Sequence, residues 1–113
     1  MKYDLSICVP GIRVQNWEKL VNTTKEGCRR YSYELIFSGP FGLPDCLKNQ
    51  SNIKYVQDFG CVSRAFQIST LLAEGELLTW FSDDGWVYPD SIDNAIDTLK
   101  HYNEAKDIVG MKY

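Results

Sequence analysis

The chain has 113 residues, 44% of them hydrophobic and 24% charged, with a formal net charge of −3, which predicts a single globular domain over residues 1–113. No apolar run is long enough to span a membrane and no signal peptide precedes the first strand, so we expect a cytoplasmic protein without a transmembrane segment, while association with a membrane surface is left open. No stripe of lysine and arginine accompanies the aromatic residues, which argues against a nucleic-acid partner.

The first strand and the first helix are predicted within residues 5–30. Residues 5–9 are an apolar run of strand-forming side chains, which Pro10 and Gly11 end. Asn16 is a good N-cap residue, and apolar side chains recur at helical spacing from Trp17 to about Arg30. We therefore expect an amphipathic helix that packs on the sheet.

Two more strands and a second helix are predicted within residues 33–75. The strands are residues 33–37, which Ser38 and Gly39 end, and residues 53–56, with a loop at residues 41–50 between them. The helix follows Gly60 and ends at Gly75. Its expected buried stripe consists of Val62, Ala65, Phe66, Ser69, Leu72 and Ala73.

A fourth strand leads directly into an acidic turn. Residues 77–81 are a short apolar run, typical of a fully buried, central strand, and Ser82, Asp83, Asp84 and Gly85 end it. Carboxylates at the carboxyl end of such a strand lie where open α/β sheets bind ligands. Mg²⁺ and Mn²⁺ prefer carboxylate oxygen. The turn is interpreted as a metal–diphosphate site, and a solvated acidic turn is the alternative.

One more helix and one more strand are predicted after this turn. Asp90 is expected to cap a helix over residues 91–102, with Asp93 in a position like that of a capping box. Residues 108–111 are expected to begin a strand. An unfinished strand leaves a sheet edge exposed, so self-association through this edge is also expected.

Strands that alternate with crossover helices predict an α/β fold, in which a mainly parallel sheet carries helices on both faces. The loops at residues 10–15, 38–41 and 82–86 then gather at one end of the sheet, where a nucleotide would lie. Arg64 is placed in the first turns of the second helix, where its charge adds to that of the unpaired N–H groups in binding an anion. An ordinary surface arginine is the alternative.

The distribution of charge is uneven along the chain. Residues 74–113 carry nine acidic side chains against three lysines, and residues 1–73 carry nine basic side chains against six acidic ones. This asymmetry suits an anion bound between arginines on one side and a carboxylate-held metal on the other, and scattered surface charge is the alternative.

Cysteine and histidine usage argues against nucleophilic catalysis. The cysteines have no metal-binding spacing and are expected to be reduced, mostly buried thiols. The single histidine, His101, lies near the end of a predicted helix, where its charge is favourable. A Ser-His-Asp or Cys-His mechanism is therefore not expected.

Four stretches, taken in order, resemble the nucleotide-sugar-binding half of a family-2 inverting glycosyltransferase of the GT-A fold. They are residues 5–10, residues 33–39, residues 60–76 and residues 81–90, the last reading Phe-Ser-Asp-Asp-Gly-Trp-Val-Tyr-Pro-Asp. Their order and spacing agree with the family from residue 5 to about residue 99. The resemblance implies a GT-A, Rossmann-like fold that stops before the acceptor-binding half.

The resemblance implies roles for both aspartates of the acidic turn. Asp84 matches the last carboxylate of the family's D-x-D motif, which holds Mn²⁺ or Mg²⁺ against the diphosphate. Asp83 matches the middle position, near the ribose or the donor sugar, and is the second candidate metal ligand. Ser82 stands where many members have the first aspartate, which weakens a two-carboxylate clamp.

The resemblance also assigns substrate contacts to the other loops. The first loop matches the one that contacts the base and the ribose, and the second matches the base-binding loop, without the aspartate that often reads the base. The choice between a UDP-sugar and a GDP-sugar therefore stays open. The residues concerned are Pro10, Gly11, Arg13, Ser38, Gly39 and, close to the helix-start arginine of many members, Arg64.

The activity that this resemblance implies is a metal-assisted transfer of a sugar from a nucleotide-diphospho-sugar to the hydroxyl of an unknown acceptor. The metal would neutralise the charge that develops on the leaving diphosphate. The general base on the acceptor hydroxyl comes from the acceptor-binding half in this family, beyond residues 111–113. We therefore expect the chain to bind the donor and, by itself, to show at best slow donor hydrolysis.

Three alternatives fit the same length. A receiver-like signalling domain binds Mg²⁺ with acidic residues after its first strand, but here that strand ends in Pro10 and Gly11. A non-catalytic nucleotide-binding or scaffolding module of the same fold is the second alternative. A nucleotidyltransferase is the third, and the glycine-rich, basic first loop typical of that class is only faintly present.

Overall fold

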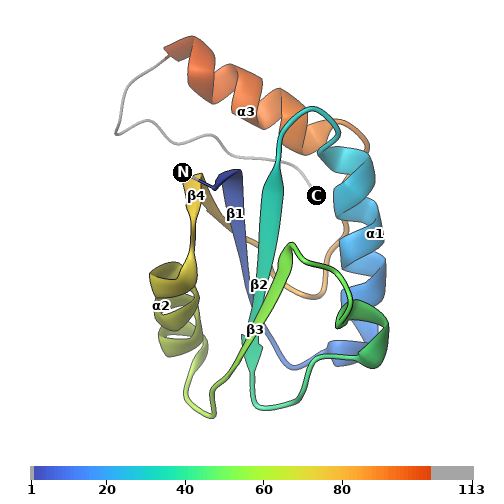
Figure 1. The fold of residues 1–113 in the computed structure, drawn as a ribbon, viewed down its shortest axis with the longest axis vertical. Helices are drawn as coiled ribbons and strands as arrows, with labels where there is room; N and C mark the ends of the chain where they lie inside the picture. The colour runs from blue at the N-terminus through green and yellow to red at the C-terminus, as the bar shows by residue number, and fades with distance from the viewer. Residues whose placement is uncertain (1, 103–113) are drawn as a thin grey trace.

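The computed structural model describes residues 2–102, which form a parallel sheet with helices on both faces (Figure 1). Within these residues the sheet has four strands in the order β3-β2-β1-β4, and every neighbouring pair is parallel. The strands are β1 (Tyr3–Pro10), β2 (Tyr33–Gly39), β3 (Ile53–Gln57) and β4 (Gly75–Trp80). The predicted fold class is confirmed.

The helices divide between the two faces of this sheet (Figure 1). Helices α1 (Trp17–Gly27) and α3 (Ser91–Tyr102) cover one face, and α2 (Val62–Leu72) covers the other. Two short 3-10 helices, η1 (Val14–Asn16) and η2 (Asp45–Leu47), lie in the connections. Among the described residues, no helix is both long and apolar enough to cross a membrane.

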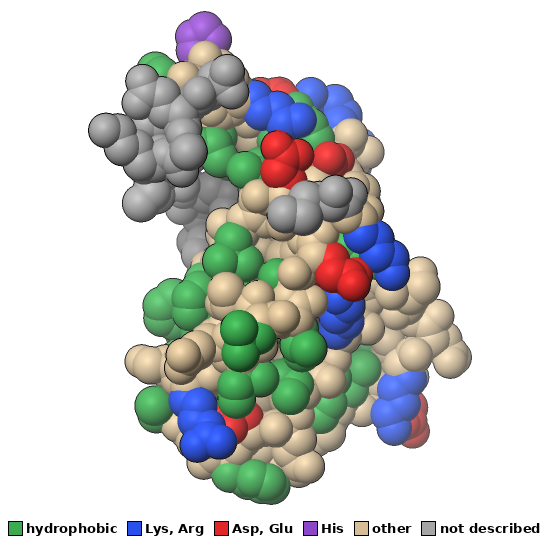
Figure 2. Space-filling view, turned by 60° about the vertical axis from the view of Figure 1, so that its left-hand side comes forward, with side chains coloured by type: hydrophobic (Ala, Val, Ile, Leu, Met, Phe, Trp, Pro, Cys, Tyr) green, Lys and Arg blue, Asp and Glu red, His purple; other side chains and the backbone are tan. Residues whose placement is uncertain are grey.

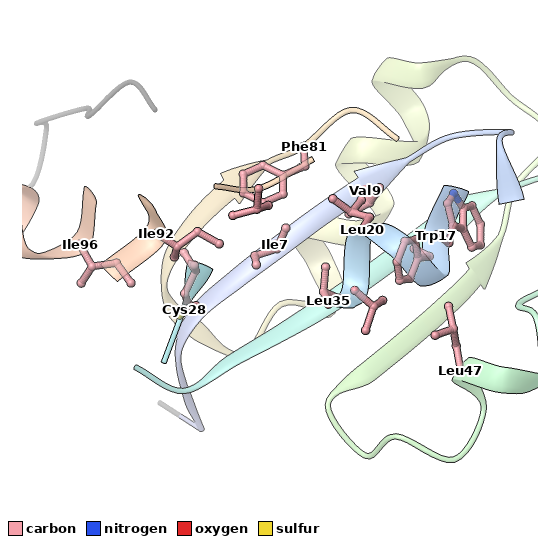
Figure 3. Close-up of a cluster of buried hydrophobic side chains, with 14 residues drawn as sticks. Ile7, Val9, Trp17, Leu20, Cys28, Leu35, Leu47, Phe81, Ile92 and Ile96 are labelled. Carbon is pink, nitrogen blue, oxygen red and sulfur yellow. The ribbon is translucent and has the colours of Figure 1, made fainter. Parts of the chain in front are cut away.

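The hydrophobic core lies between the sheet and the pair α1 and α3 (Figure 3). Alternate side chains of the central strands point into it, because successive strand residues face opposite sides of a sheet. Ile7 of β1 and Leu35 of β2 are fully buried there beside Trp17 of α1. The Trp17 ring also stacks on the ring of Phe37, with 4.4 Å between centroids. Trp17 thus anchors the first turn of α1 to the sheet.

A buried carboxylate, that of Glu34, connects the strands on the opposite face. Its Oε2 accepts hydrogen bonds from Ser6 Oγ and from the Glu74 N–H, each 2.6 Å long. Its Oε1 forms an ion pair with Lys54 Nζ at 2.7 Å. Burial alone would raise the pKa of Glu34, but these hydrogen bonds and the lysine charge outweigh it and hold the pKa below its ordinary value of 4.5. Glu34 therefore links β1, β2, β3 and the start of β4 as an ionised group.

The position of β4 differs from the prediction of a central, fully buried strand. Within residues 2–102, β4 is an edge strand, and Leu78 and Trp80 are about half exposed, at 47% and 53%. The Trp80 ring lies 5.1 Å from that of Phe66 in α2. Hydrophobic side chains gather on this face of the molecule (Figure 2). The self-association predicted through the unfinished strand at residues 108–111 concerns residues outside the described range and stays a prediction.

The predicted buried stripe of α2 is only partly confirmed. Ala65 and Ser69 are buried, but Val62 and Leu72 are exposed. The reason is that α2 packs on β1 and β2, where small side chains allow close approach, while its other flank lies beside the sheet edge. Periodicity shows which side chains share a helix face, but not how much of that face is covered.

Asn16 and Asp93 lie at the starts of α1 and α3 as predicted, but their side chains form hydrogen bonds to other segments. The Asn16 side chain makes no capping hydrogen bond to α1 and donates instead to the backbone oxygen of Asp83, at 3.0 Å. The buried carboxylate of Asp93 accepts the backbone N–H groups of Arg29 and Arg30, at 2.9 and 3.1 Å. Both side chains satisfy backbone groups of a neighbouring segment, because α1 packs against the loop after β4 and against α3.

Two other expectations can be compared with the structure. All four cysteines are free thiols, as expected, but only Cys8 and Cys28 are buried, whereas Cys46 and Cys61 are exposed. The strand predicted at residues 108–111 lies outside the described residues.

Glu34→Gln is expected to lower the free energy of unfolding at pH 7 by about 3 kcal/mol, because the change removes one partner of a buried ion pair. The pH dependence should change as well. The folded-state pKa of Glu34 is lowered, so its stabilisation is complete above the pKa of the unfolded state and is lost as the pH falls through the folded-state pKa. Urea unfolding at several pH values measures both effects.

The matched control is Glu76→Gln, a change at an exposed position of β4. It should alter the unfolding free energy by less than about 0.5 kcal/mol. Equal losses for the two variants, or an unchanged acid sensitivity in Glu34→Gln, would contradict the role of the buried network.

Candidate functional site

The loops that follow the four strands meet at one edge of the sheet, as expected for parallel strands (Figure 1). The Gly11 N–H donates to the Ser38 carbonyl and the Asp58 N–H donates to the Gly39 carbonyl, each at 2.9 Å. We call this surface the loop edge; it comprises residues 10–13, 38–41, 58–64 and 82–86. It is the place where open α/β sheets usually bind ligands.

Asp83, the first of the two adjacent aspartates, has a buried carboxylate that joins the loop edge to α1. Its Oδ2 accepts the Arg13 backbone N–H at 2.7 Å and the Trp17 indole Nε1–H at 3.2 Å. Its Oδ1 accepts a hydrogen bond from Arg13 Nη1 at 3.0 Å. The residue is only 1% exposed. These donors satisfy the oxygens of a carboxylate whose burial without partners would cost free energy.

Asp84, the second aspartate, is exposed at the loop edge. Ser82 Oγ donates a hydrogen bond to its Oδ1 at 2.5 Å. This hydrogen bond, together with the nearby positive charge of Arg13, lowers the pKa of Asp84. Asp84 is therefore ionised and accessible at neutral pH, which is the state that a cation requires.

Two glycines allow the loops to approach closely. A Cβ on Gly11 would lie 2.1 Å from Asp83 Oδ2, and a Cβ on Gly39 would lie 2.2 Å from the Gly11 carbonyl oxygen. No side chain fits at such distances. The two positions thus hold the ends of β1 and β2 and the acidic turn in one tight assembly.

Pro10, the last residue of β1, pairs with Ser38 near the end of β2, and both residues are buried. The Ser38 hydroxyl donates to the Ala65 carbonyl at 3.2 Å and accepts a hydrogen bond from Ser69 Oγ at 3.0 Å. Its side chain therefore faces α2, and only its backbone takes part in the loop edge.

Arg64 lies in the first turn of α2, with a side chain that is 67% exposed. Its Nε pairs with Asp58 Oδ1 at 3.0 Å, and Asp58 Oδ2 accepts the Gly60 N–H at 3.1 Å. Asp58 thereby fixes both the turn before α2 and the arginine. Arg13 also presents a partly exposed guanidinium, 48% exposed, at the same edge.

The segment after Asp84 runs along α1. The Val87 N–H donates to Thr23 Oγ1 at 3.3 Å, and the Asp90 N–H donates to the Glu26 carbonyl at 3.1 Å. Successive turns of the helix therefore fasten the loop that carries Asp84.

Several residues of the site were not predicted from the sequence. They are Asp58, which fixes Arg64 and the turn before α2, and Asn16 and Trp17, which donate hydrogen bonds to Asp83. For Asp58 a sequence signal was available, namely an aspartate two residues before a turn glycine. Large apolar side chains are also exposed along the loop edge without a sequence signal, among them Ile12, Phe41 and Phe59.

The donor groups at this edge fit a metal ion only in part. Residues 2–102 contain no group of three or more histidine, cysteine, aspartate or glutamate side chains that could hold one. The carboxylate of Asp83 is occupied by N–H donors, which leaves that of Asp84 accessible. A single carboxylate is sufficient for Mg²⁺ when substrate phosphates supply further oxygens.

Comparison with solved structures identifies the fold of the chain. It is similar to S. aureus TarS, a glycosyltransferase, with a TM-score of 0.71 and 17% sequence identity. The chain has a glycosyltransferase-like fold. The similarity covers 88% of this chain and 20% of TarS, so the chain spans about a fifth of that protein's length. No protein-family model and no curated protein matches the sequence.

Gly11→Ala is expected to destabilise the protein by about 1–3 kcal/mol, since the added methyl group would displace the Asp83 carboxylate from its donors. Thermal and urea unfolding measure the loss. Gly42→Ala is the matched control, because nothing lies within 4 Å of its added Cβ. An equal effect of the two substitutions would show that the contact between Gly11 and Asp83 does not constrain the loop edge.

Proposed function

We propose that the chain is the donor-binding portion of a glycosyltransferase and binds a nucleotide-diphospho-sugar at the loop edge. One observation carries the proposal. An accessible, ionised carboxylate, that of Asp84, lies at the same edge of a glycosyltransferase-like fold as the exposed guanidinium groups of Arg13 and Arg64. This combination suits a diphosphate that is bound together with a divalent cation.

Asp84 is the residue proposed to hold Mg²⁺ or Mn²⁺, with the oxygens of the diphosphate as the other ligands. The cation would supply Lewis-acid stabilisation of the leaving diphosphate. Arg13 and Arg64 are proposed to donate hydrogen bonds to the phosphates, and the N-terminus of α2 adds its unpaired N–H groups. Arginine suits this task because its planar group presents several donors at once.

The nucleoside is proposed to lie over the ends of β1 and β2. Gly11 and Gly39 are proposed to shape this surface from below, because the space beside each Cα is filled by Asp83 and by the Gly11 carbonyl oxygen, respectively. Pro10 and Ser38 would contribute through their backbone, since both side chains are buried. The neighbouring apolar side chains in the loops, Phe41 and Phe59 among them, offer surface for a planar base.

Transfer to an acceptor hydroxyl also requires a general base. We assign none to residues 2–102 and propose that the acceptor-binding residues belong to a further part of the protein. The activity proposed for the whole protein is sugar transfer, and the property proposed for this chain is donor binding.

Calorimetric titration with UDP and GDP tests the proposal. We expect one of them to bind in the presence of Mg²⁺ or Mn²⁺. Asp84→Ala should weaken this metal-dependent binding at least about tenfold, since even outer-shell partners of a metal are worth about 10- to 100-fold in affinity. Glu76→Ala, near the amino end of β4 and therefore far from the loop edge, is the matched control and should bind as the wild type does.

Two outcomes would contradict the proposal. One is a folded wild-type sample that binds neither nucleotide with either metal. The other is equal binding by the wild type and Asp84→Ala, which would remove Asp84 from the site. In the first case the non-catalytic scaffolding alternative would gain support.

A further inference from the structure

Asp83 and Asp84 are neighbours in sequence but differ in what their carboxylates can do. Asp84 is exposed, whereas Asp83 is 1% exposed and accepts three N–H donors. A carboxylate has about four acceptor positions, so little of Asp83 remains for a ligand. A ligand that contacted this carboxylate would have to displace protein donors from a buried place.

The donors that Asp83 holds belong mainly to Arg13. The backbone N–H of Arg13 lies 2.7 Å from Oδ2 and its guanidinium Nη1 lies 3.0 Å from Oδ1, so one carboxylate fixes both ends of this residue. The guanidinium has five N–H donors and uses one of them here. Because the side chain is 48% exposed, the other donors are available at the loop edge.

The surroundings of Asp83 fix it in turn. The Trp17 indole donates to Oδ2 at 3.2 Å, and the Asn16 side chain donates to the Asp83 carbonyl oxygen at 3.0 Å. Gly11 packs so closely that a Cβ there would lie 2.1 Å from Oδ2. The carboxylate is thus enclosed by the loop after β1 and by the start of α1, both anchored to the core through Trp17.

We propose that Asp83 is a positioning residue, which holds the Arg13 guanidinium ready for the diphosphate and does not itself touch the ligand. In this arrangement Asp84 binds the cation and Arg13 donates hydrogen bonds to the phosphates. An arginine that is held before the ligand arrives loses less conformational freedom on binding, which favours affinity. This inference rests on the proposed function, since it assigns Arg13 to the same donor site.

A double-mutant cycle separates positioning from direct contact. The probe is UDP or GDP, whichever the wild type binds, with Mg²⁺, and the variants are Asp83→Asn, Arg13→Gln and the double variant. Each single change should weaken binding by about tenfold, the usual worth of one charge-assisted contact. If Asp83 acts through Arg13, the double variant should bind no more weakly than Arg13→Gln alone.

Additive losses, about a hundredfold in the double variant, would overturn the inference, because they would show that Asp83 has its own contact with the ligand. Unchanged nucleotide affinity in Arg13→Gln would also overturn the inference. This variant tests the inference even if Asp83→Asn does not fold. Failure of the wild type to bind either nucleotide would overturn the proposed function together with this inference. If the wild type binds a nucleotide and the affinity losses of the two variants are additive, only this inference is overturned and the proposed function stands.

A spectroscopic signature distinguishes positioning from a general loss of structure. The indole N–H resonance of Trp17 reports its hydrogen bond to Asp83, and the indole of Trp80 on β4 serves as the internal reference. In Arg13→Gln this resonance should stay at its wild-type position while nucleotide affinity falls. A displaced Trp17 resonance in that variant would attribute the lost affinity to a disturbed core, and would overturn the inference.

Discussion

The hydrogen bonds that Asp83 accepts from Arg13 and Trp17 are the interaction on which the loop edge depends. They connect the loop after β4 to the loop after β1 across about 70 positions of sequence, and they do so through a carboxylate that the core encloses. At the other end of the sheet, Glu34 plays a comparable part among the strand beginnings. Two buried carboxylates therefore hold the two ends of one sheet, and N–H, O–H or ammonium groups surround both of them.

The charge asymmetry of the sequence has a counterpart at the loop edge. Arg13 and Arg64 come from the basic part of the chain and Asp84 from the acidic part, and all three are exposed at this edge. The parallel topology explains how this happens, because it brings every strand end to the same side. The similarity to TarS concerns this arrangement of strands and helices, and the chemistry proposed for the edge depends on the side chains themselves.

Hydrophobic periodicity predicted the strands, the helices and the parallel α/β class, because those features follow from local patterns. It predicted neither the edge position that β4 has within residues 2–102 nor the exposure of Trp80, since both depend on which strands pair, and pairing is not local. The acidic turn was located at residues 82–85, but local patterns did not show that Asp83 is buried and Asp84 exposed. Their difference in burial comes from Trp17 and Arg13, which are distant in sequence and contact only one of the two carboxylates.

The attachment of the loop after β4 to α1 also limits how the sequence can change. Thr23 holds this loop through its side chain and Glu26 through its backbone carbonyl, from successive turns, so the angular positions of both residues on the helix matter. One inserted residue within α1 would rotate everything beyond it by about 100° and carry these groups away from the loop. Insertions and deletions should therefore be rare between residues 16 and 27 in related proteins, whereas the open surroundings of Gly42 can accommodate them.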